Sequence, residues 1–381
     1  MTQSRKLRYA LIGGGPGAFI GPVHRIAAEL DSRAEIVAGA FSSSPEKSRA
    51  AAASYKIDPA RAYATWQELI AAEKQRLDGI DFLIVATPNH LHLPVTKAAL
   101  EAGIPVVSDK PATATYDEVL ELEKVVASAG LPYALTHTYA GYALIREARA
   151  ICASGVLGNI RKVAVDYLQG WLSQPIEETG QKQAGWRVDP KISGPGGAIG
   201  DIGTHAFHLV EYVTGLEFTA LNATLRSVIP TRKVDDDCTA LFKLNNGAQG
   251  TLLISQIATG EGNNPRLRVY GDKASLHWEQ EDPNNLILRT PGRPVQTYRA
   301  SESYLSPDAL SVARTPSGHP EGYLEAFAVL YREFADWLEA WTQDKSVQAP
   351  ATLPGIKAGV RGMRFIERCI ASNTSGTWVE F

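Results

Sequence analysis

The feature that most constrains the fold is a glycine-rich loop, LIGGGPGAFIG, between the first apolar run of the chain and its first amphipathic stretch. Glycines let a backbone approach a pyrophosphate closely, and a following helix offers free N–H groups and the positive end of its dipole. The spacing departs from G-x-G-x-x-G, because Gly13-x-Gly15 is followed by five residues before Gly21 and Gly15-x-Gly17 by three. The loop predicts a dinucleotide site and leaves the part of each glycine open.

The first third of the chain alternates short apolar runs with amphipathic stretches. The runs have the character of buried parallel strands and lie at 8–15, 34–41, 81–88, 105–111 and 132–137. The stretches are typical of helices and lie at 22–30, 45–55, 66–75, 93–103 and 116–130. This alternation predicts an α/β domain, a doubly wound parallel sheet of Rossmann type, which we place at residues 1–137.

The pattern changes after residue 137. Segments of strand length separated by NG, GD and PNN turns occupy 217–300, which is typical of an antiparallel sheet. A long loop is expected at 301–320. Helices are predicted at 142–155, 323–341 and 355–372. Because 381 residues are too many for one ordinary core, we expect a second, mixed α/β domain at 138–381.

Composition excludes several classes of protein. The net charge of -3 gives no reason to expect nucleic acid or an anionic membrane as a partner. Cys152, Cys238 and Cys369 lack the spacing of metal ligands or of a disulfide framework, so we predict reduced thiols. The N-terminal apolar run is short for a secretory signal, and no run approaches the ~20 residues of a membrane span. We therefore expect a cytoplasmic protein.

The choice of cofactor is expected to depend on AGAFSSSPEKS, which follows the second predicted strand. This segment lacks the carboxylate that commonly binds the ribose 2′-hydroxyl of NAD. Ser42, Ser43 and Lys47 either bind a 2′-phosphate or hydrogen-bond that hydroxyl, and Ser44-Pro45 is also typical of a helix N-cap. The sequence leaves NAD and NADP open.

Polar residues follow two other predicted strands. Asn89 and His92 of ATPNHLH come after one of them, and Asp109 and Lys110 of VVSDKP end the other. Sheets of this kind bind ligands at the carboxyl ends of their strands. A lysine beside a nicotinamide pocket would be partly desolvated and able to move a proton. The alternative is a lysine that only extends from a strand end into solvent.

A further candidate segment is GDIGTHAFHL at 200–209. Asp201 and His205 are four residues apart and therefore share a face if the segment is a helix. A zinc site needs three or four ligands, and His208 does not share that face, so we expect no metal here. His208 is expected to be a packed histidine or a secondary substrate contact. The acidic run 235–237 is interpreted as a charged turn before a strand rather than a cation site.

Taken in order, the glycine loop, ATPNHLH, DKP, YLQGW, GWR and GDIGTH resemble the glucose–fructose oxidoreductase and inositol dehydrogenase (Gfo/Idh/MocA) family. YLQGW and GWR are similar to its levoglucosan-dehydrogenase-like branch. The resemblance covers nearly the whole chain and implies a Rossmann domain plus an α/β domain with a large open antiparallel sheet. It also implies tightly bound NAD or NADP, a homodimer or homotetramer formed through that sheet, and hydride transfer to or from a secondary hydroxyl of a sugar, glycoside or polyol.

The resemblance assigns roles to individual residues. Lys110 matches the family's catalytic lysine, and Asp201 and His205 match its D-x-x-x-H pair, with His205 as general acid/base for the substrate hydroxyl. The expected cofactor contacts are Gly13, Gly15, Gly17, Phe19, Ile20, Ser42, Ser43, Lys47, Thr87, Pro88, Asn89, His92, Asp109 and Lys110. The expected substrate contacts are Lys110, Tyr139, Gln169, Trp171, Lys182, Trp186, Arg187, Asp201 and His205.

Some of these positions leave alternatives open. Asp109 stands where the family usually has glutamate. Trp171 and Trp186 either stack on a pyranose ring or pack in the core. Lys182 and Arg187 hint at an anionic group on the sugar.

Two other functions share these motifs. Some family members are glycosidases in which tightly held NAD transiently oxidises the sugar, the aglycone is eliminated, water adds and the hydride returns. Such an enzyme would use the same Lys110, Asp201 and His205. The fold also serves as a non-catalytic sugar or dinucleotide sensor, which the presence of these three residues disfavours. We expect the dehydrogenase.

Overall fold

A computed structural model of the protein describes residues 5–15 and 17–381. The chain divides into two compact units, which we call unit 1, comprising residues 1–137 and 327–360, and unit 2, comprising residues 138–326 and 361–381. Unit 2 begins at the residue where the sequence places the second domain. Residues 327–360 group with unit 1, although the sequence reading assigned them to the second domain.

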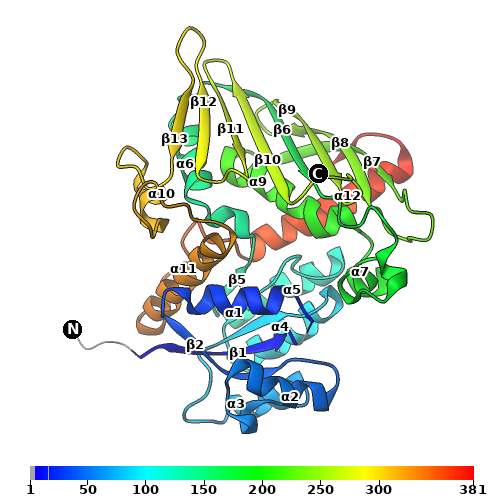
Figure 1. Cartoon of the computed structure of the whole chain (residues 1–381), viewed down its shortest axis with the longest axis vertical. Coiled ribbons are helices and arrows are strands. Elements are labelled where there is room, and N and C mark those ends of the chain that lie inside the picture. The colour runs from blue at the N-terminus through cyan, green and yellow to red at the C-terminus, as the bar shows by residue number, and fades with distance from the viewer. Residues whose placement is uncertain (1–4, 16) are drawn as a thin grey trace. The chain divides into compact units, whose positions relative to one another are not determined.

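Unit 1 is built around a five-stranded parallel sheet in the order β2-β1-β3-β4-β5 (Figure 1). Its strands are β1 Leu7–Gly13, β2 Ala34–Ala40, β3 Phe82–Ala86, β4 Val106–Ser108 and β5 Tyr133–Leu135. The last three are buried along their whole length, which explains why their sequences are continuous apolar runs. The predicted strands and the parallel sheet are confirmed.

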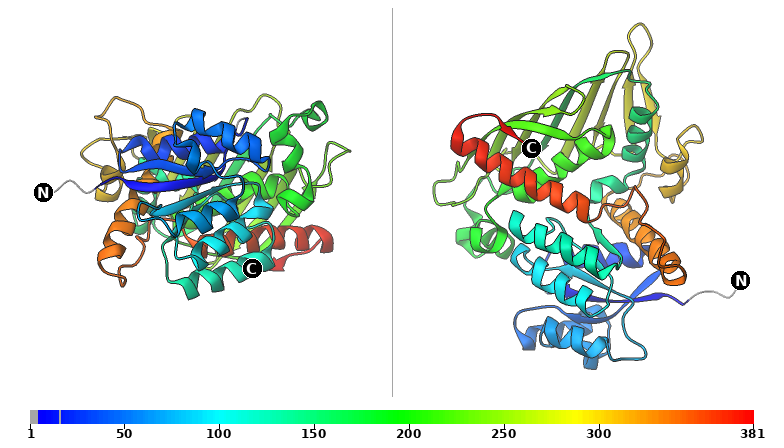
Figure 2. Two further views of the ribbon diagram at one scale, coloured as in Figure 1. Left: turned by 90° about the horizontal axis from the view of Figure 1, so that it is seen from below. Right: turned by 180° about the vertical axis from the view of Figure 1, so that it is seen from behind.

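Helices connect the strands of unit 1. They are α1 Ile20–Leu30, α2 Pro45–Tyr55, α3 Trp66–Glu73, α4 His92–Glu101 and α5 Tyr116–Ala129, with 3₁₀ turns η1 Pro59–Arg61 and η2 Asn89–Leu91. Thr115 and Glu118 form a capping box at the start of α5, and Gly130 ends that helix with a φ of 61°. Figure 1 shows α1 in front of the sheet, and the view from behind in Figure 2 shows the cyan α4 and α5 on the opposite face.

Two long helices lie near the C-terminus, α11 Tyr323–Gln343 and α12 Ile356–Ser375, and the boundary between the units falls within both. Within unit 1, Phe334 of α11 packs on Phe82 of β3 with ring centroids 5.3 Å apart. Aromatic burial therefore attaches this part of α11 to the first sheet. Among the described residues, no helix is long and apolar enough to cross a membrane.

Unit 2 contains a nine-stranded sheet in the order β13-β12-β11-β10-β6-β9-β8-β7-β14. Its strands are β6 Ile160–Leu168, β7 Phe218–Arg226, β8 Asp237–Leu244, β9 Gln249–Ser255, β10 Asn264–Gly271, β11 Ser275–Glu279, β12 Asn285–Arg289, β13 Gln296–Arg299 and β14 Val379–Glu380. In the described part of the chain, β6 and β9 run parallel and the other neighbouring strands run antiparallel. The predicted antiparallel sheet is confirmed, with this one parallel pair inside it.

The helices named next for unit 2 precede β6, lie between β6 and β7, or lie between β13 and β14. They are η3 Thr138–Gly141, α6 Ala143–Ala153, η4 Ile176–Thr179, α7 Lys182–Arg187, α8 Pro190–Ser193, the π-helical turn η5 Ile199–Gly203, α9 Thr204–Thr214 and α10 Pro307–Val312. Helix α10 corrects the expectation of an unbroken loop at 301–320. Ser306 accepts the Ala309 N–H at 3.3 Å, and Pro307 occupies the first turn, which is ordinary N-terminal helix chemistry.

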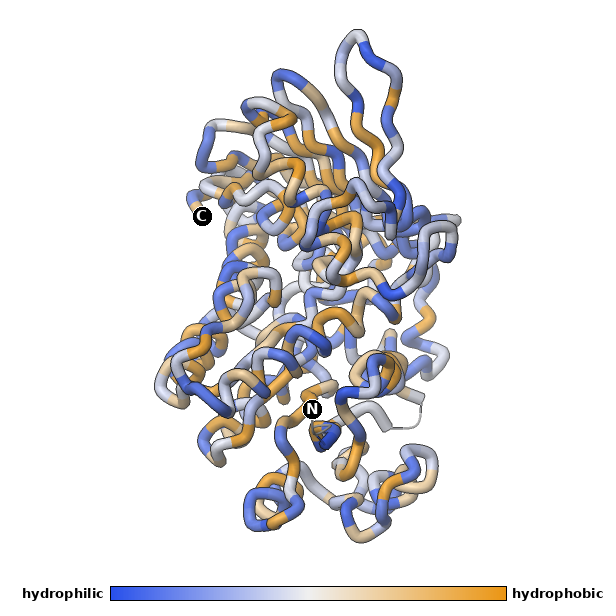
Figure 3. Tube along the Cα trace, turned by 90° about the vertical axis from the view of Figure 1, so that its left-hand side faces the viewer, coloured by the Kyte–Doolittle hydropathy of each residue, from blue (hydrophilic) through white to orange (hydrophobic). Residues whose placement is uncertain are grey.

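The cores of the units follow the hydropathy of the chain. Figure 3 shows hydrophobic segments along the strands and hydrophilic ones in many of the connecting loops. Strand β8 alternates buried and exposed residues, as expected for a sheet with helices on one face. On its other face the apolar Leu241, Leu253 and Tyr270 are exposed, and the strand registers place them on the same side of the sheet.

Candidate active site

The glycine loop of unit 1 leads from the carboxyl end of β1 into α1. Gly13 has a φ of 89°, Gly14 of 69° and Gly17 of 80°, values that favour glycine. A Cβ on Gly13 would meet the Ala86 carbonyl, and a Cβ on Gly21 would meet the backbone of Gly14. Backbone atoms also lie too close to Gly14 and Gly15 for a Cβ, so close packing requires glycine at positions 13, 14, 15 and 21. This narrow turn fits the cradle of a dinucleotide pyrophosphate.

The residues after β2 form the N-terminus of α2. Ser44 caps the helix by accepting the Lys47 N–H at 3.4 Å, so the N-cap interpretation is confirmed. Ser42 accepts the Ser44 N–H at 3.2 Å. The side chains of Ser43 and Lys47 are exposed. The hydroxyls of Ser42 and Ser44 thus accept backbone N–H groups of this turn, while Ser43 and Lys47 remain accessible to solvent.

His92, the first residue of α4, contacts the backbone segments that follow β3 and β4. Its Nε2 lies 2.9 Å from the Thr87 carbonyl oxygen, and its Nδ1 lies 2.6 Å from the Pro111 carbonyl oxygen. The ring has no exposed surface, and burial lowers the pKa of His92. His92 therefore shapes the predicted cofactor edge through the backbone that follows β3 and β4.

Asp109 and Lys110 follow β4. The Asp109 Oδ1 accepts the Thr136 hydroxyl at 2.9 Å and the Lys110 N–H at 2.9 Å. Burial opposes ionisation of this carboxyl, but His24, Lys110 and His92 together hold the pKa of Asp109 well below its ordinary value. These groups favour the ionised form of the carboxyl that precedes the predicted catalytic lysine. Lys110 itself is half-buried.

In unit 2, Asp201 lies on the π-helical turn η5 and His205 lies in the first turn of α9. Buried Asp235 holds the start of this segment, because its carboxylate accepts the Gly197 N–H at 2.7 Å and the Ile199 N–H at 2.8 Å. The sequence predicts a regular helix here, and the structure differs by placing a π turn before it. Such turns are rare and frequently occur at functional sites.

The acidic run 235–237 has a second backbone contact. Asp236 accepts the Val228 N–H at 2.7 Å and the Ile229 N–H at 3.0 Å. Burial raises the pKa of Asp235 to about 6, despite its two backbone hydrogen bonds. The run therefore fixes two segments that precede it in the chain, 197–199 and 228–229.

The Asp235→Asn variant is expected to lose part of the pH dependence of stability. The folded-state pKa of about 6 lies above the ordinary value of about 3.9 for an unfolded chain. Between these pH values the folded state binds more protons, so stability falls as pH rises through the window, by about 3 kcal/mol. Asparagine cannot titrate. Urea unfolding from pH 4 to 7 should show the decline in the wild type and a flatter profile in the variant. Equal slopes would contradict this assignment.

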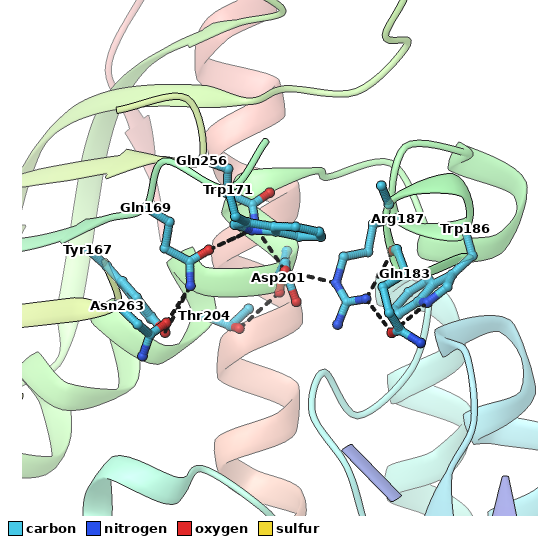
Figure 4. Close-up of polar contacts among 12 residues, drawn as sticks. Tyr167, Gln169, Trp171, Gln183, Trp186, Arg187, Asp201, Thr204, Gln256 and Asn263 are labelled. Carbon is cyan, nitrogen blue, oxygen red and sulfur yellow. Dashed lines mark hydrogen bonds and ion pairs between the residues drawn. The ribbon is translucent and has the colours of Figure 1, made fainter. Parts of the chain in front are cut away.

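Two side chains hold the Asp201 carboxylate (Figure 4). Arg187 Nε donates to its Oδ2 at 3.1 Å, and Gln256 Nε2 donates to the same oxygen at 2.9 Å. The Arg187 guanidinium lies 4.2 Å from the ring centroid of Trp186 and 5.8 Å from that of Trp171. Both tryptophans are partly exposed. They therefore border this ion pair rather than fill the core.

Neutral amide and hydroxyl groups extend from this carboxylate (Figure 4). Gln256 Nε2 also donates to Gln169 Oε1 at 3.3 Å. Trp171 Nε1 donates to the same oxygen at 3.0 Å. Asn263 Oδ1 accepts hydrogen bonds from Gln169 Nε2 at 2.5 Å and from the Tyr167 hydroxyl at 2.8 Å. The result is a continuous uncharged polar network beside the ion pair.

His205 is buried at the other end of this network. Its ring meets that of Tyr139 edge-on, with centroids 4.9 Å apart and an interplanar angle of 82°. The Tyr139 hydroxyl lies 2.6 Å from that of Tyr167 and accepts a hydrogen bond from the Asn263 amide at 3.3 Å. Tyr139, predicted as a substrate contact, is thus buried and orients the His205 ring. The structure brings His205 and Tyr139 together, and it connects Gln169, Trp171, Arg187 and Asp201 in the same network.

The sequence reading missed three members of the network, Tyr167, Gln256 and Asn263. Tyr167 is near the end of β6, Gln256 follows β9, and Asn263 precedes β10. Polar residues at strand ends are common ligand contacts. That position was the available signal, but which strand ends meet is not a local property of the sequence.

Two other predicted residues are also placed by the structure. His208 is buried and stacks on Tyr212 with ring centroids 5.4 Å apart. Burial lowers the pKa of His208 to about 3, so the ring is a neutral packed residue at ordinary pH, as predicted. Lys182 is exposed at the start of α7.

Comparison with known proteins places this geometry in a family. Residues 7–137 match the family model described as "Oxidoreductase family, NAD-binding Rossmann fold", and residues 145–277 match the "GFO/IDH/MocA C-terminal domain". The chain is 33% identical over 383 residues to "Uncharacterized oxidoreductase YfiI" of Bacillus subtilis (strain 168), a match that covers 99% of this chain and 98% of that protein.

Two further relatives have more specific descriptions. The chain is 37% identical to an inositol dehydrogenase homolog from Azotobacter vinelandii, and each match covers 99% of this chain and 98% of that chain. The TM-score is 0.94 to the structure with NAD+ and 0.93 to the structure with NADH and myo-inositol. It is 27% identical over 317 residues to levoglucosan dehydrogenase of Pseudarthrobacter phenanthrenivorans, covering 74% of this chain and 76% of that protein. The chain belongs to the Gfo/Idh/MocA family of NAD-binding oxidoreductases.

Proposed function

We propose that this protein is an NAD-dependent dehydrogenase that oxidises a secondary hydroxyl of an uncharged cyclic polyol or sugar. The observation that carries the proposal is the network of unit 2. In it a paired Asp201, neutral amides and tyrosine hydroxyls lead to a buried histidine. Groups of this kind can donate to and accept from several hydroxyls.

The cofactor is proposed to bind the glycine loop of unit 1. Gly13, Gly15 and Gly17 with the N-terminus of α1 would hold the pyrophosphate, while Ser43 and Lys47 lie accessible beside α2. NAD is favoured over NADP because the matching family model is NAD-binding and the inositol dehydrogenase homolog was solved with NAD+ and NADH. When bound, NAD+ accepts the hydride that leaves the substrate carbon.

The chain's own residues handle the proton and the position of the hydroxyl. We assign the Lys110 ammonium to the substrate oxygen, where a cation stabilises negative charge that develops as the proton leaves. His205 takes that proton as the C–H bond breaks and the C=O bond forms. Asp201, fixed by Arg187 and Gln256, orients a neighbouring hydroxyl. These roles are proposals that rest on the match to the family motifs.

The substrate is proposed to be uncharged. The weak signal for an anionic sugar came from Lys182 and Arg187. The charge of Arg187 is paired with Asp201, and Lys182 is exposed at the start of α7. The higher identity to the inositol dehydrogenase homolog than to levoglucosan dehydrogenase favours a cyclitol. The relatives described above are oxidoreductases and dehydrogenases, which favours net oxidation over the redox-neutral glycosidase.

A substrate panel tests this function. The purified protein with NAD+ should form NADH with myo-inositol or a related cyclitol, and more slowly with levoglucosan and neutral aldoses. Sugar phosphates and uronates should be poor substrates. Release of aglycone from an aryl glycoside without accumulation of NADH would instead establish the glycosidase.

Assembly and location are also proposed. The exposed Leu241, Leu253 and Tyr270 on the outer face of the unit 2 sheet support a homodimer or homotetramer formed through that face. Cys152, Cys238 and Cys369 are free thiols, which supports a cytoplasmic protein.

A further inference from the structure

A buried histidine that the proposed chemistry does not use lies on α1 of unit 1. His24 has no exposed surface, and its ring meets Phe327 edge-on with centroids 4.9 Å apart. Its Nδ1 lies 2.6 Å from the Tyr331 hydroxyl, and its Nε2 lies 3.8 Å from Asp109 Oδ1. A polar ring buried among aromatic side chains destabilises the fold unless such partners compensate it.

The carboxylate decides which nitrogen of His24 carries hydrogen. Nε2 faces an anion that would repel a lone pair, so Nε2 carries a hydrogen. In the neutral ring Nδ1 then accepts the Tyr331 hydroxyl. Burial raises the pKa of Tyr331 well above its ordinary value, and the charge of Asp109 raises it further, so this hydroxyl keeps its proton. At 3.8 Å the contact to Asp109 is electrostatic rather than a direct hydrogen bond.

Side chains from several elements of unit 1 face Asp109. His24 comes from α1, His92 from α4, Thr136 follows β5 and Tyr331 comes from α11, while Lys110 is next in the chain. One oxygen, Oδ1, accepts the Thr136 hydroxyl and the Lys110 N–H and also faces His24. Movement of this carboxylate would therefore disturb the backbone that carries the lysine.

We propose that Tyr331, His24 and Asp109 form a positioning chain that fixes the main chain of Lys110 and keeps an anion beside it. This inference rests on the proposed function, because it assigns a role around the proposed catalytic lysine. The three residues come from α11, α1 and the segment that follows β4, all within unit 1.

The test uses His24→Leu and Tyr331→Phe in the full-length protein. For His24→Leu we expect kcat to fall about tenfold, with KM for the polyol and Kd for NAD+ within about twofold. The pH profile of kcat should gain an acidic limb, because desolvation then opposes the charge of Asp109 with less compensation. Tyr331→Phe keeps the ring and removes only the hydroxyl. It should lower kcat by about threefold and give the pH profile of kcat a weaker acidic limb.

Two variants serve as controls. Tyr9→Phe removes another buried hydroxyl of unit 1, one that bonds Glu29 at 3.2 Å, and should leave kcat and its pH profile unchanged. His24→Gln keeps a donor and an acceptor at this position and should recover most of the lost kcat. If His24→Leu does not fold, Tyr331→Phe decides the question.

A carboxyl NMR titration of Asp109 separates this inference from the proposed function, since it needs no turnover. A higher Asp109 midpoint in His24→Leu and in Tyr331→Phe supports the positioning chain. An unchanged midpoint and an unchanged kcat profile in both variants would overturn it while leaving a dehydrogenase. Absence of NADH formation from every polyol, with the Asp109 midpoint still shifted, would overturn the proposed function instead.

Discussion

Lys110→Met is expected to lower kcat/KM for the polyol by about a hundredfold to ten-thousandfold. Methionine has a similar length but no charge, so the substrate oxygen loses the cation that stabilises it as its proton leaves. The residue is half-buried at the end of β4 beside the ionised Asp109, where a charge has more effect than in water. Steady-state kinetics should show the loss mainly in kcat, and quenching of protein fluorescence should give a Kd for NAD+ within about threefold of wild type.

Lys97→Met provides the matched control. Lys97 is a partly exposed lysine of unit 1 on α4, paired with Glu121 at 2.7 Å, so its replacement should leave both constants nearly unchanged. A wild-type kcat in Lys110→Met would contradict the proposed role of Lys110 at the substrate oxygen. A loss of NAD+ binding with normal kcat at saturating cofactor would move Lys110 to the cofactor site alone.

His205→Gln is expected to reduce kcat by about a hundredfold or more, with a small change in KM. Glutamine retains hydrogen-bonding capacity but cannot take the proton of the hydroxyl. Because His205 is buried against Tyr139, no solvent base of similar strength can replace it easily. With substrate deuterated at the reacting carbon, the isotope effect on kcat should be at least as large as in the wild type, because the C–H bond breaks in the step that the variant slows.

His277→Gln is the control for this variant. His277 lies on β11 of the same unit and is only partly buried. The His277→Gln variant should therefore have the kcat of the wild type. An undiminished rate in His205→Gln would remove the histidine from the reaction. An equal loss in both variants would point to damage of unit 2 as a whole.

Much of the fold was predictable because its signals are local. The runs at 34–41 and 81–88 are apolar over strand length, and the structure has β2 and β3 there. The Thr115 capping box and the αL Gly130 delimit α5 by chemistry within a few residues. The glycine loop was predictable in the same way. The structural role of each glycine in the loop could not be predicted, because Gly21 is required by its contact with Gly14, seven residues earlier.

The candidate site was predictable only in part. Asp201 and His205 could be named from one short segment, but the π turn that carries Asp201 depends on Asp235, more than thirty residues later. Gln256 and Asn263 do not lie in any of the sequence motifs that pointed to the site. Their amides gain a role because β9 and β10 flank β6 in the sheet of unit 2.

The sequence by itself determined the strand–helix order, the nucleotide-type loop, the family motifs and the identity of the proposed catalytic side chains, since each depends on residues that are neighbours in the chain. Only the tertiary structure decided that residues 327–360 group with unit 1, that Arg187 is neutralised by Asp201, and that Tyr331 and His24 stand beside Asp109. These facts depend on contacts between residues up to 307 positions apart. Such contacts form only when burial of apolar surface brings separate elements together, and no local pattern records them.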